Sequence, residues 1–209
     1  MEKPAKKPML IAAAIAIAVV AALVIVLGMN GTPSDASPEA GFARDMGTHH
    51  AQAVEMSFIV YDRTASRDVR NLAFDIINTQ STQRGMFQGW LQQWGLSPAG
   101  ERPQMAWMSG HGHSGTAATG TAMPGMASAA ELTRLRGLKD KDAEVLFLQL
   151  MIRHHEGGVQ MAKGLLSLSS RDEVASLANK IVTGQTGEIK LMTDLLKQRG
   201  AQPLPSILK

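Results

Sequence analysis

The sequence contains no cysteine among its 209 residues. This absence excludes disulfides, thiolate metal sites and cysteine nucleophiles together. The chain also lacks a strong excess of either charge: its net charge is +3, and Lys3, Lys6 and Lys7 at the N-terminus supply much of it. Elsewhere the basic residues are interspersed with acidic ones, so no basic surface of the kind that binds nucleic acid is expected.

Several catalytic and fold signals are missing as well. We find no phosphate-binding glycine loop, no plausible Ser-His-Asp set and no paired carboxylates at a spacing typical of acid–base catalysis. No segment shows sustained period-two alternation of apolar residues, which argues against a sheet. We therefore expect an all-α protein that is not an enzyme.

Methionine, by contrast, is abundant: thirteen methionines stand beside five phenylalanines and one tyrosine. Methionine is a flexible filler of hydrophobic cores, so the simplest interpretation of any single one is packing. The positions of the methionines relative to histidine decide whether a further role is indicated.

The one long apolar run covers residues 9–29 and carries no charge. As a helix rising about 1.5 Å per residue it would span roughly 31 Å, close to the hydrocarbon thickness of a bilayer. The preceding lysines favour a cytoplasmic N-terminus, which places the rest of the chain outside the cytoplasm. A cleaved signal peptide ending at Ala36 is the alternative, and it would give a secreted protein.

Helical periodicity follows the apolar run. Apolar residues spaced three and four apart predict helices over residues 42–61, 68–94, 140–167 and 171–199, and a short helix is possible over 129–138. The predicted organisation is a cytoplasmic tip and transmembrane anchor over 1–29, a linker over 30–41, a duplicated bundle over 42–200 with a Met- and His-rich irregular connector over 96–130, and a tail over 201–209.

The bundle region contains an internal repeat. Residues 46–95 align without a gap on residues 151–200, and 13 of the 50 aligned positions are identical. This offset of 105 residues indicates two duplicated helical hairpins. Each predicted helix has a single apolar stripe, so the two hairpins should bury these stripes together as a four-helix bundle.

The repeat preserves an unusual motif, a methionine, a histidine pair and a second methionine. On a helix, residues three, four and seven apart share a face, so each motif forms one patch toward the bundle interior. The candidate metal-ligating residues are Met46, His49, His50, Met56, Met151, His154, His155 and Met161.

Two interpretations of these patches remain open. The histidines could be core residues with hydrogen bonds to Gln80, Gln185 and Glu188, in a structural or protein-interaction bundle without metal. If a metal binds, thioether sulfur combined with imidazole favours Cu(I), and also Ag(I), over ions that prefer carboxylates. A di-iron centre of the Glu-x-x-His type is a poor fit, because that motif does not occur in the sequence.

The connector adds a possible secondary site. Methionines and histidines lie there in a Gly-, Ser- and Thr-rich context with little apparent capacity to pack. The secondary candidates are Met105, Met108, His111, His113, Met123 and Met126.

The two motifs, "MGTHHAQAVEMS" and "MIRHHEGGVQMA", are each followed by a second helix, "QSTQRGMFQGWLQQWG" and "QTGEIKLMTDLLKQRG". With the Met-Pro-Gly-Met of the connector, they resemble the domain of unknown function 305 family over residues 42–200. The resemblance implies a ferritin-like four-helix bundle, usually exported, and copper binding or copper resistance in some members. Carried over position by position, it implies that the eight methionines and histidines of the two motifs are ligands.

Two positions depart from the family pattern. Gly157 and Gly158 replace the Ala-like residues expected after the second histidine pair, and we expect them to loosen that helix. Arg84 stands where the second repeat has Ile189, in a segment that is usually apolar.

The sequence thus predicts an extracytoplasmic Cu(I)-binding protein that buffers copper or transfers it to copper-handling partners. Because neutral imidazole is the ligand, the affinity of the histidines should fall below about pH 6.5, the ordinary pKa of histidine. A redox metalloenzyme is a weaker third possibility.

Overall fold

The computed structural model describes residues 11, 14–21, 31–108 and 123–208. The chain forms two compact units, residues 1–33 and 34–209. In the first unit, residues 14–21 are helical. Among the described residues, no helix is both long enough and apolar enough to cross a membrane. The anchor predicted over residues 9–29 lies largely outside the described residues and stays a prediction.

The second unit begins its helical part with α2, Pro38–Tyr61. The helix starts four residues before the predicted position because Ser37 caps it: the Ser37 side chain accepts a hydrogen bond from the Ala40 N–H. Pro38 occupies the first turn, where its missing N–H costs nothing.

The other long helices are α3, Arg67–Gln93, α5, Asp140–Leu168, and α6, Asp172–Gln198. The hairpin ends match in the two repeats. Gly95 follows α3 with φ of 70°, and Gly200 follows α6 with φ of 69°. This left-handed backbone is favourable for glycine and ends a helix, so the helix ends predicted near residues 94 and 199 are confirmed.

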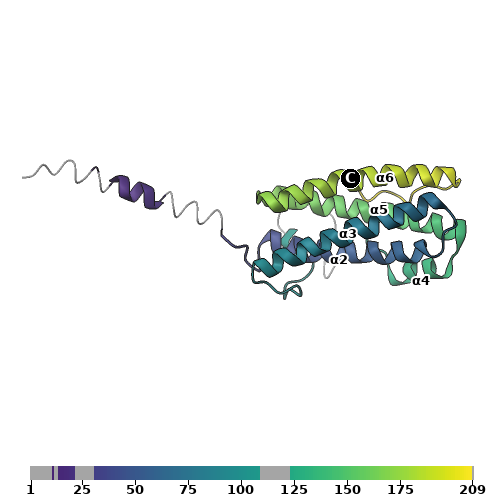
Figure 1. Cartoon of the computed structure of the whole chain (residues 1–209), viewed down its shortest axis with the longest axis horizontal. Coiled ribbons are helices and arrows are strands. Elements are labelled where there is room, and N and C mark those ends of the chain that lie inside the picture. The colour runs from purple at the N-terminus through teal and green to yellow at the C-terminus, as the bar shows by residue number, and fades with distance from the viewer. Residues whose placement is uncertain (1–10, 12–13, 22–30, 109–122, 209) are drawn as a thin grey trace, which may run out of the picture. The chain divides into compact units, whose positions relative to one another are not determined.

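The helices pack as two hairpins, α2 against α3 and α5 against α6, and the hairpins meet through α2 and α5 (Figure 1). No strand occurs in the described part of the chain. The predicted all-α bundle is therefore confirmed, and the two helices that carry the histidine pairs form its central contact.

Helix α5 continues without a break through Gly157 and Gly158, so the expected loosening is wrong. The glycines instead admit neighbours at close range. A Cβ on Gly157 would lie 2.0 Å from the Pro124 carbonyl oxygen, and one on Gly158 would lie 2.3 Å from Gln185 Oε1. The small residues therefore allow the connector and α6 to approach α5.

The described ends of the connector are folded and packed. A 3₁₀ turn spans Ala106–Met108, and α4, Ala129–Gly137, starts at a capping box of Ser128 and Glu131. Trp107 and Met123 are buried. The prediction of a short helix before α5 is confirmed, whereas the expectation that connector residues pack little is wrong for these segments.

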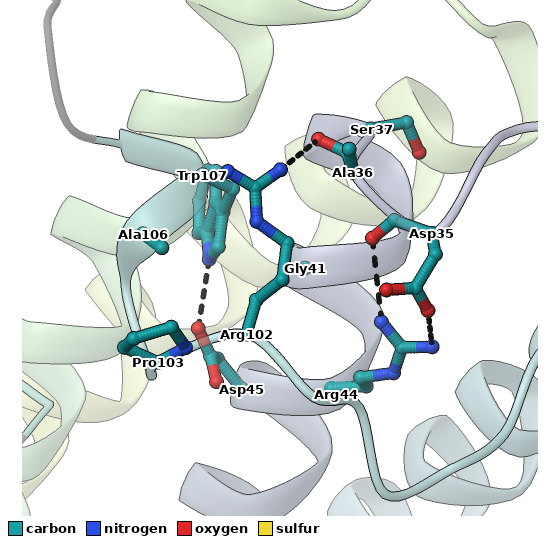
Figure 2. Close-up of a pocket in the computed structure, with 10 residues that line it drawn as sticks. All are labelled: Asp35, Ala36, Ser37, Gly41, Arg44, Asp45, Arg102, Pro103, Ala106 and Trp107. Atoms are coloured by element: carbon teal, nitrogen blue, oxygen red, sulfur yellow. Dashed lines mark hydrogen bonds and ion pairs between the residues drawn. The ribbon is translucent and has the colours of Figure 1, made fainter.

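Asp45 holds the first of these segments (Figure 2). Its Oδ2 accepts hydrogen bonds from the Trp107 indole Nε1–H at 2.9 Å and from the Met105 backbone N–H at 2.7 Å. Arg102 reaches back to the Ala36 carbonyl, 3.1 Å away. These contacts fasten the connector over the first turns of α2.

Candidate metal centre

Four buried imidazoles form a layer where α2 and α5 meet. His49 and His50 of α2 and His154 and His155 of α5 are each 0 % exposed to solvent. The rings of His49 and His154 lie face to face, with centroids 3.7 Å apart and planes inclined by 33°. The structure thus brings the two predicted histidine pairs together from separate hairpins.

Three of the imidazoles are held through Nε2. His49 Nε2 lies 3.0 Å from the Pro124 carbonyl oxygen, His50 Nε2 lies 2.6 Å from Gln83 Oε1, and His155 Nε2 lies 2.6 Å from Glu188 Oε2. Each partner atom is an acceptor, so Nε2 carries the proton and donates in all three cases. A neutral imidazole with a proton on Nε2 has a lone pair on Nδ1, where a metal can bind.

These Nδ1 atoms have no hydrogen-bond partner within the described part of the chain, and His154 has none on either nitrogen. A buried polar atom without a partner costs roughly 1–3 kcal/mol. The unpartnered buried side-chain atoms are His49 Nδ1, His50 Nδ1, His154 Nδ1 and Nε2, His155 Nδ1, Ser57 Oγ, and the amide nitrogens and oxygens of Gln80 and Gln185. A ligand bound inside this layer would satisfy several of them.

Burial lowers the pKa of three of the four imidazoles. It lowers the pKa of His49 to about 4 and that of His50 to about 3, with a smaller contribution from neighbouring histidines. Burial also lowers the pKa of His154 well below its ordinary value. These three imidazoles therefore remain ligands to lower pH than the ordinary histidine pKa suggests, and for them the expected threshold near pH 6.5 moves downward.

The four motif methionines lie on either side of the histidine layer, and each is 0 % exposed. Met46 and Met161 belong to one hydrophobic cluster, and Met56 and Met151 belong to the other. Helices α2 and α5 therefore run antiparallel, so each end of the layer receives one thioether from each hairpin. The donor set fits a soft ion, because it combines thioether sulfur with neutral imidazole.

The connector methionines extend one of these clusters. Met123 is buried in the same cluster as Met46 and Met161, and the partly buried Met105, Met108 and Met126 pack against that cluster. His111 and His113 lie outside the described residues. The described members of the predicted secondary site therefore belong to, or pack against, the hydrophobic cluster that contains Met46 and Met161.

Carboxylates add little to the donor set. No group of three or more His, Asp and Glu side chains in the described part of the chain has the arrangement of a metal site. The pocket of Figure 2, lined by Asp45, Arg44 and Trp107 among others, contains none of the candidate ligands. A site formed by the described residues would have to include thioethers.

The sequence interpretation missed Gln83 and Pro124 as partners of the histidines. Gln83 could have been found, because it is the counterpart of Glu188 at the repeat offset of 105 residues. Pro124 could not, because its contact with His49 joins residues 75 apart in the chain. Of the three expected partners, Glu188 is confirmed, whereas Gln80 and Gln185 make no hydrogen bond to the imidazoles.

Comparison with known proteins identifies the family. The description "Domain of unknown function (DUF305)" matches residues 39–196, so the chain belongs to the DUF305 family. A DUF305 protein from Streptomyces coelicolor, described as secreted, is 48 % identical, with a TM-score of 0.74 over 82 % of this chain and 99 % of its own. A DUF305 fragment from Deinococcus radiodurans is 38 % identical, with a TM-score of 0.63 over 77 % and 96 % of the two chains.

The fold is also similar to that of CopM in its Cu(I)-bound form. The two chains are 24 % identical, and the TM-score is 0.57 over 79 % of this chain and 97 % of CopM. This likeness establishes the shared fold. No curated protein shows significant similarity to the chain.

Proposed function

We propose that this protein binds Cu(I), and also Ag(I), outside the cytoplasm, and that it buffers copper or passes it to copper-handling partners. The observation that carries the proposal is the buried layer of four imidazoles. Three of them present a free Nδ1 lone pair because Nε2 is held, and methionine pairs lie on both sides.

The donor set supports a soft monovalent ion. Thioethers bind Cu(I) and Ag(I) well, and they are poor ligands for Mg²⁺, Ca²⁺ and other hard ions. CopM, which shares the fold, is known in Cu(I)-bound, Cu(II)-bound and Ag-bound forms. The four imidazoles are fully buried in the described part of the chain, and we propose binding and transfer in place of catalysis.

The location is proposed from two observations. The Streptomyces coelicolor relative is described as secreted. In this chain the uncharged residues 9–29 follow three lysines, so we propose that they anchor the protein in the membrane with the bundle outside. Signal cleavage, which would release the bundle, is the alternative.

The test is a Cu(I) competition titration of the full chain in detergent against a chromogenic chelator. Two variants address the two donor types. One replaces the four histidines by glutamine, and the other replaces Met46, Met56, Met151 and Met161 by leucine, which nearly conserves volume. Each should lose at least about tenfold in affinity, or about 1.4 kcal/mol.

Met192→Leu is the matched control. Met192 is a fully buried methionine of α6 outside the two motifs, so its replacement should leave the affinity unchanged. Circular dichroism would establish that each variant is folded. Absence of Cu(I) binding by the folded parent chain would refute the proposal and leave the structural bundle as the explanation of the histidine layer.

A further inference from the structure

The histidine layer has two halves: His49 and His50 of α2 form the first, and His154 and His155 of α5 form the second. The halves have the same donors but different groups behind them. In each repeat, the second histidine of the pair donates from Nε2 to a side chain on the following helix. In the first repeat the acceptor is Gln83, and in the second it is the counterpart residue Glu188, both at 2.6 Å. The geometry is therefore preserved while the charge differs by one unit.

The next residue increases this difference. Arg84 follows Gln83, whereas its counterpart Ile189 follows Glu188 and packs against the hydrophobic core. Arg84 therefore adds a positive charge one residue beyond the acceptor of His50, where the second repeat has none. The first half thus has a neutral acceptor and a nearby cation, and the second has an anion and an apolar neighbour.

Differences in ligand type cannot separate the halves. Both motifs have methionine at the first and eleventh positions and histidine at the fourth and fifth. A preference of one half for a particular ion must therefore come from the groups that surround the imidazoles.

Building on the proposed copper function, we propose that Glu188 is a positioning residue that makes the His155 half of the layer the site for divalent Cu(II). The His50 half, with Gln83 and Arg84 behind it, is the half for monovalent Cu(I) or Ag(I). A carboxylate that accepts from a ligating imidazole fixes its tautomer and raises its basicity. It also adds a negative charge, whose attraction for a bound ion grows with the charge of that ion.

The asymmetry gives the protein a way to hold copper in either oxidation state without changing its donors. The neutral half avoids placing excess negative charge beside a monovalent ion, which binds well to thioether and neutral imidazole. The anionic half compensates the second charge of Cu(II). The charge of residue 188 is then the determinant of selectivity.

The experiment compares Cu(II) and Ag(I) affinities of the full chain in detergent, with Ag(I) as a redox-inert monovalent probe. Glu188→Gln keeps an acceptor for His155 and removes only the charge. We expect it to weaken Cu(II) binding by about 10- to 100-fold and to change Ag(I) binding by less than about threefold. Gln83→Glu, the reciprocal change, should strengthen Cu(II) binding.

Two measurements separate a charge effect from a structural one. ¹⁵N NMR should show the same His155 tautomer in the parent and Glu188→Gln, because both retain the hydrogen bond. Electron paramagnetic resonance of bound Cu(II) should differ between them. Glu188→Leu, which removes acceptor and charge together, should weaken both ions because His155 loses its fixed orientation.

Equal weakening of both ions in Glu188→Gln, or no effect on Cu(II), would overturn the inference. A parent chain that binds Ag(I) but not Cu(II) would overturn the inference alone and leave the proposed function standing. A folded parent that binds neither ion would overturn both.

Discussion

The two hairpins have the same donors but use counterpart positions for different tasks. At one such pair of positions, the side-chain amide of Gln52 in α2 makes two hydrogen bonds to Ala127. Its Oε1 accepts from the Ala127 N–H at 2.6 Å, and its Nε2 donates to the Ala127 carbonyl oxygen at 2.9 Å. Gly157 of α5 has no side chain and admits the Pro124 carbonyl. Both arrangements hold the same connector loop, one by a long side chain and one by the absence of a side chain.

The residue before the first methionine differs in the same way. Asp45 binds the connector through Trp107 and Met105, whereas its counterpart Leu150 is part of the hydrophobic core. Duplication therefore preserved the donors, and divergence changed the residues that hold the connector. The connector joins the two hairpins only once, so it cannot make the same contacts with both.

The largest expected effect concerns acid stability of the metal-free protein. His49 and His50 stay neutral in the folded state, with pKa values of about 4 and about 3, but titrate near 6.5 when unfolded. Stability is complete above pH 6.5 and falls as pH decreases toward the folded pKa values. By pH 5 the free energy of unfolding should drop by about 2 kcal/mol for each histidine.

The measurement is urea denaturation between pH 7 and pH 5, a range above the acid titration of Glu131, whose pKa its ion pair with Arg153 lowers to about 2. A His49→Leu/His50→Leu variant should show a flatter profile, whatever its absolute stability. An equally steep profile in this variant would contradict the assignment of the acid sensitivity to the first pair.

The second effect tests the close approach of the connector to α5. Gly157→Ala places a Cβ 2.0 Å from the Pro124 carbonyl oxygen, so backbone must move. We expect a loss of about 3 kcal/mol in the free energy of unfolding, at the upper end of typical overpacking costs. Denaturant titration of the two chains measures it.

Gly187→Ala is the matched control for that change, because a Cβ on this helical glycine meets no atom within 4 Å. It should stabilise the protein by roughly 0.5–1 kcal/mol. If both substitutions stabilised the protein, the contact between α5 and the Pro124 loop would not be present in solution.

The third effect tests whether Asp45 can be replaced by leucine, the residue at its counterpart position 150. Asp45→Leu removes the acceptor of two hydrogen bonds and leaves the Trp107 indole and the Met105 N–H without a partner. The expected loss of stability is about 2 kcal/mol. Trp107 fluorescence should shift as its surroundings change, and an unchanged spectrum would argue against the hydrogen bond between Trp107 and Asp45.

The smallest effect concerns Gln52. Gln52→Ala removes two hydrogen bonds to Ala127, and we expect a loss of about 1 kcal/mol because water replaces part of the interaction. Hydrogen exchange should show faster exchange of the Ala127 amide. A Gln88→Ala change, at an exposed glutamine of α3, serves as the control and should have no measurable effect.

The four long helices could be predicted because their signals are local. Apolar spacing and the glycines at 95 and 200 each act within a few residues. The predicted start of α2 lies four residues late because the predicted linker, residues 30–41, includes the Ser37 cap and Pro38. The connector could not be predicted, since the bond from Trp107 to Asp45 joins residues 62 apart.

The sequence by itself determined the all-α class, the duplication and the eight candidate donors, because periodicity and repeated spacing are properties of the linear chain. Only the tertiary structure decided that His49 stacks on His154, and that Met46 shares a hydrophobic cluster with Met161 and Met56 shares one with Met151. It also decided which nitrogen of each anchored imidazole is free, through Pro124, Gln83 and Glu188. These outcomes depend on how two hairpins and a connector pack, and packing joins residues whose separation in the chain carries no local signal.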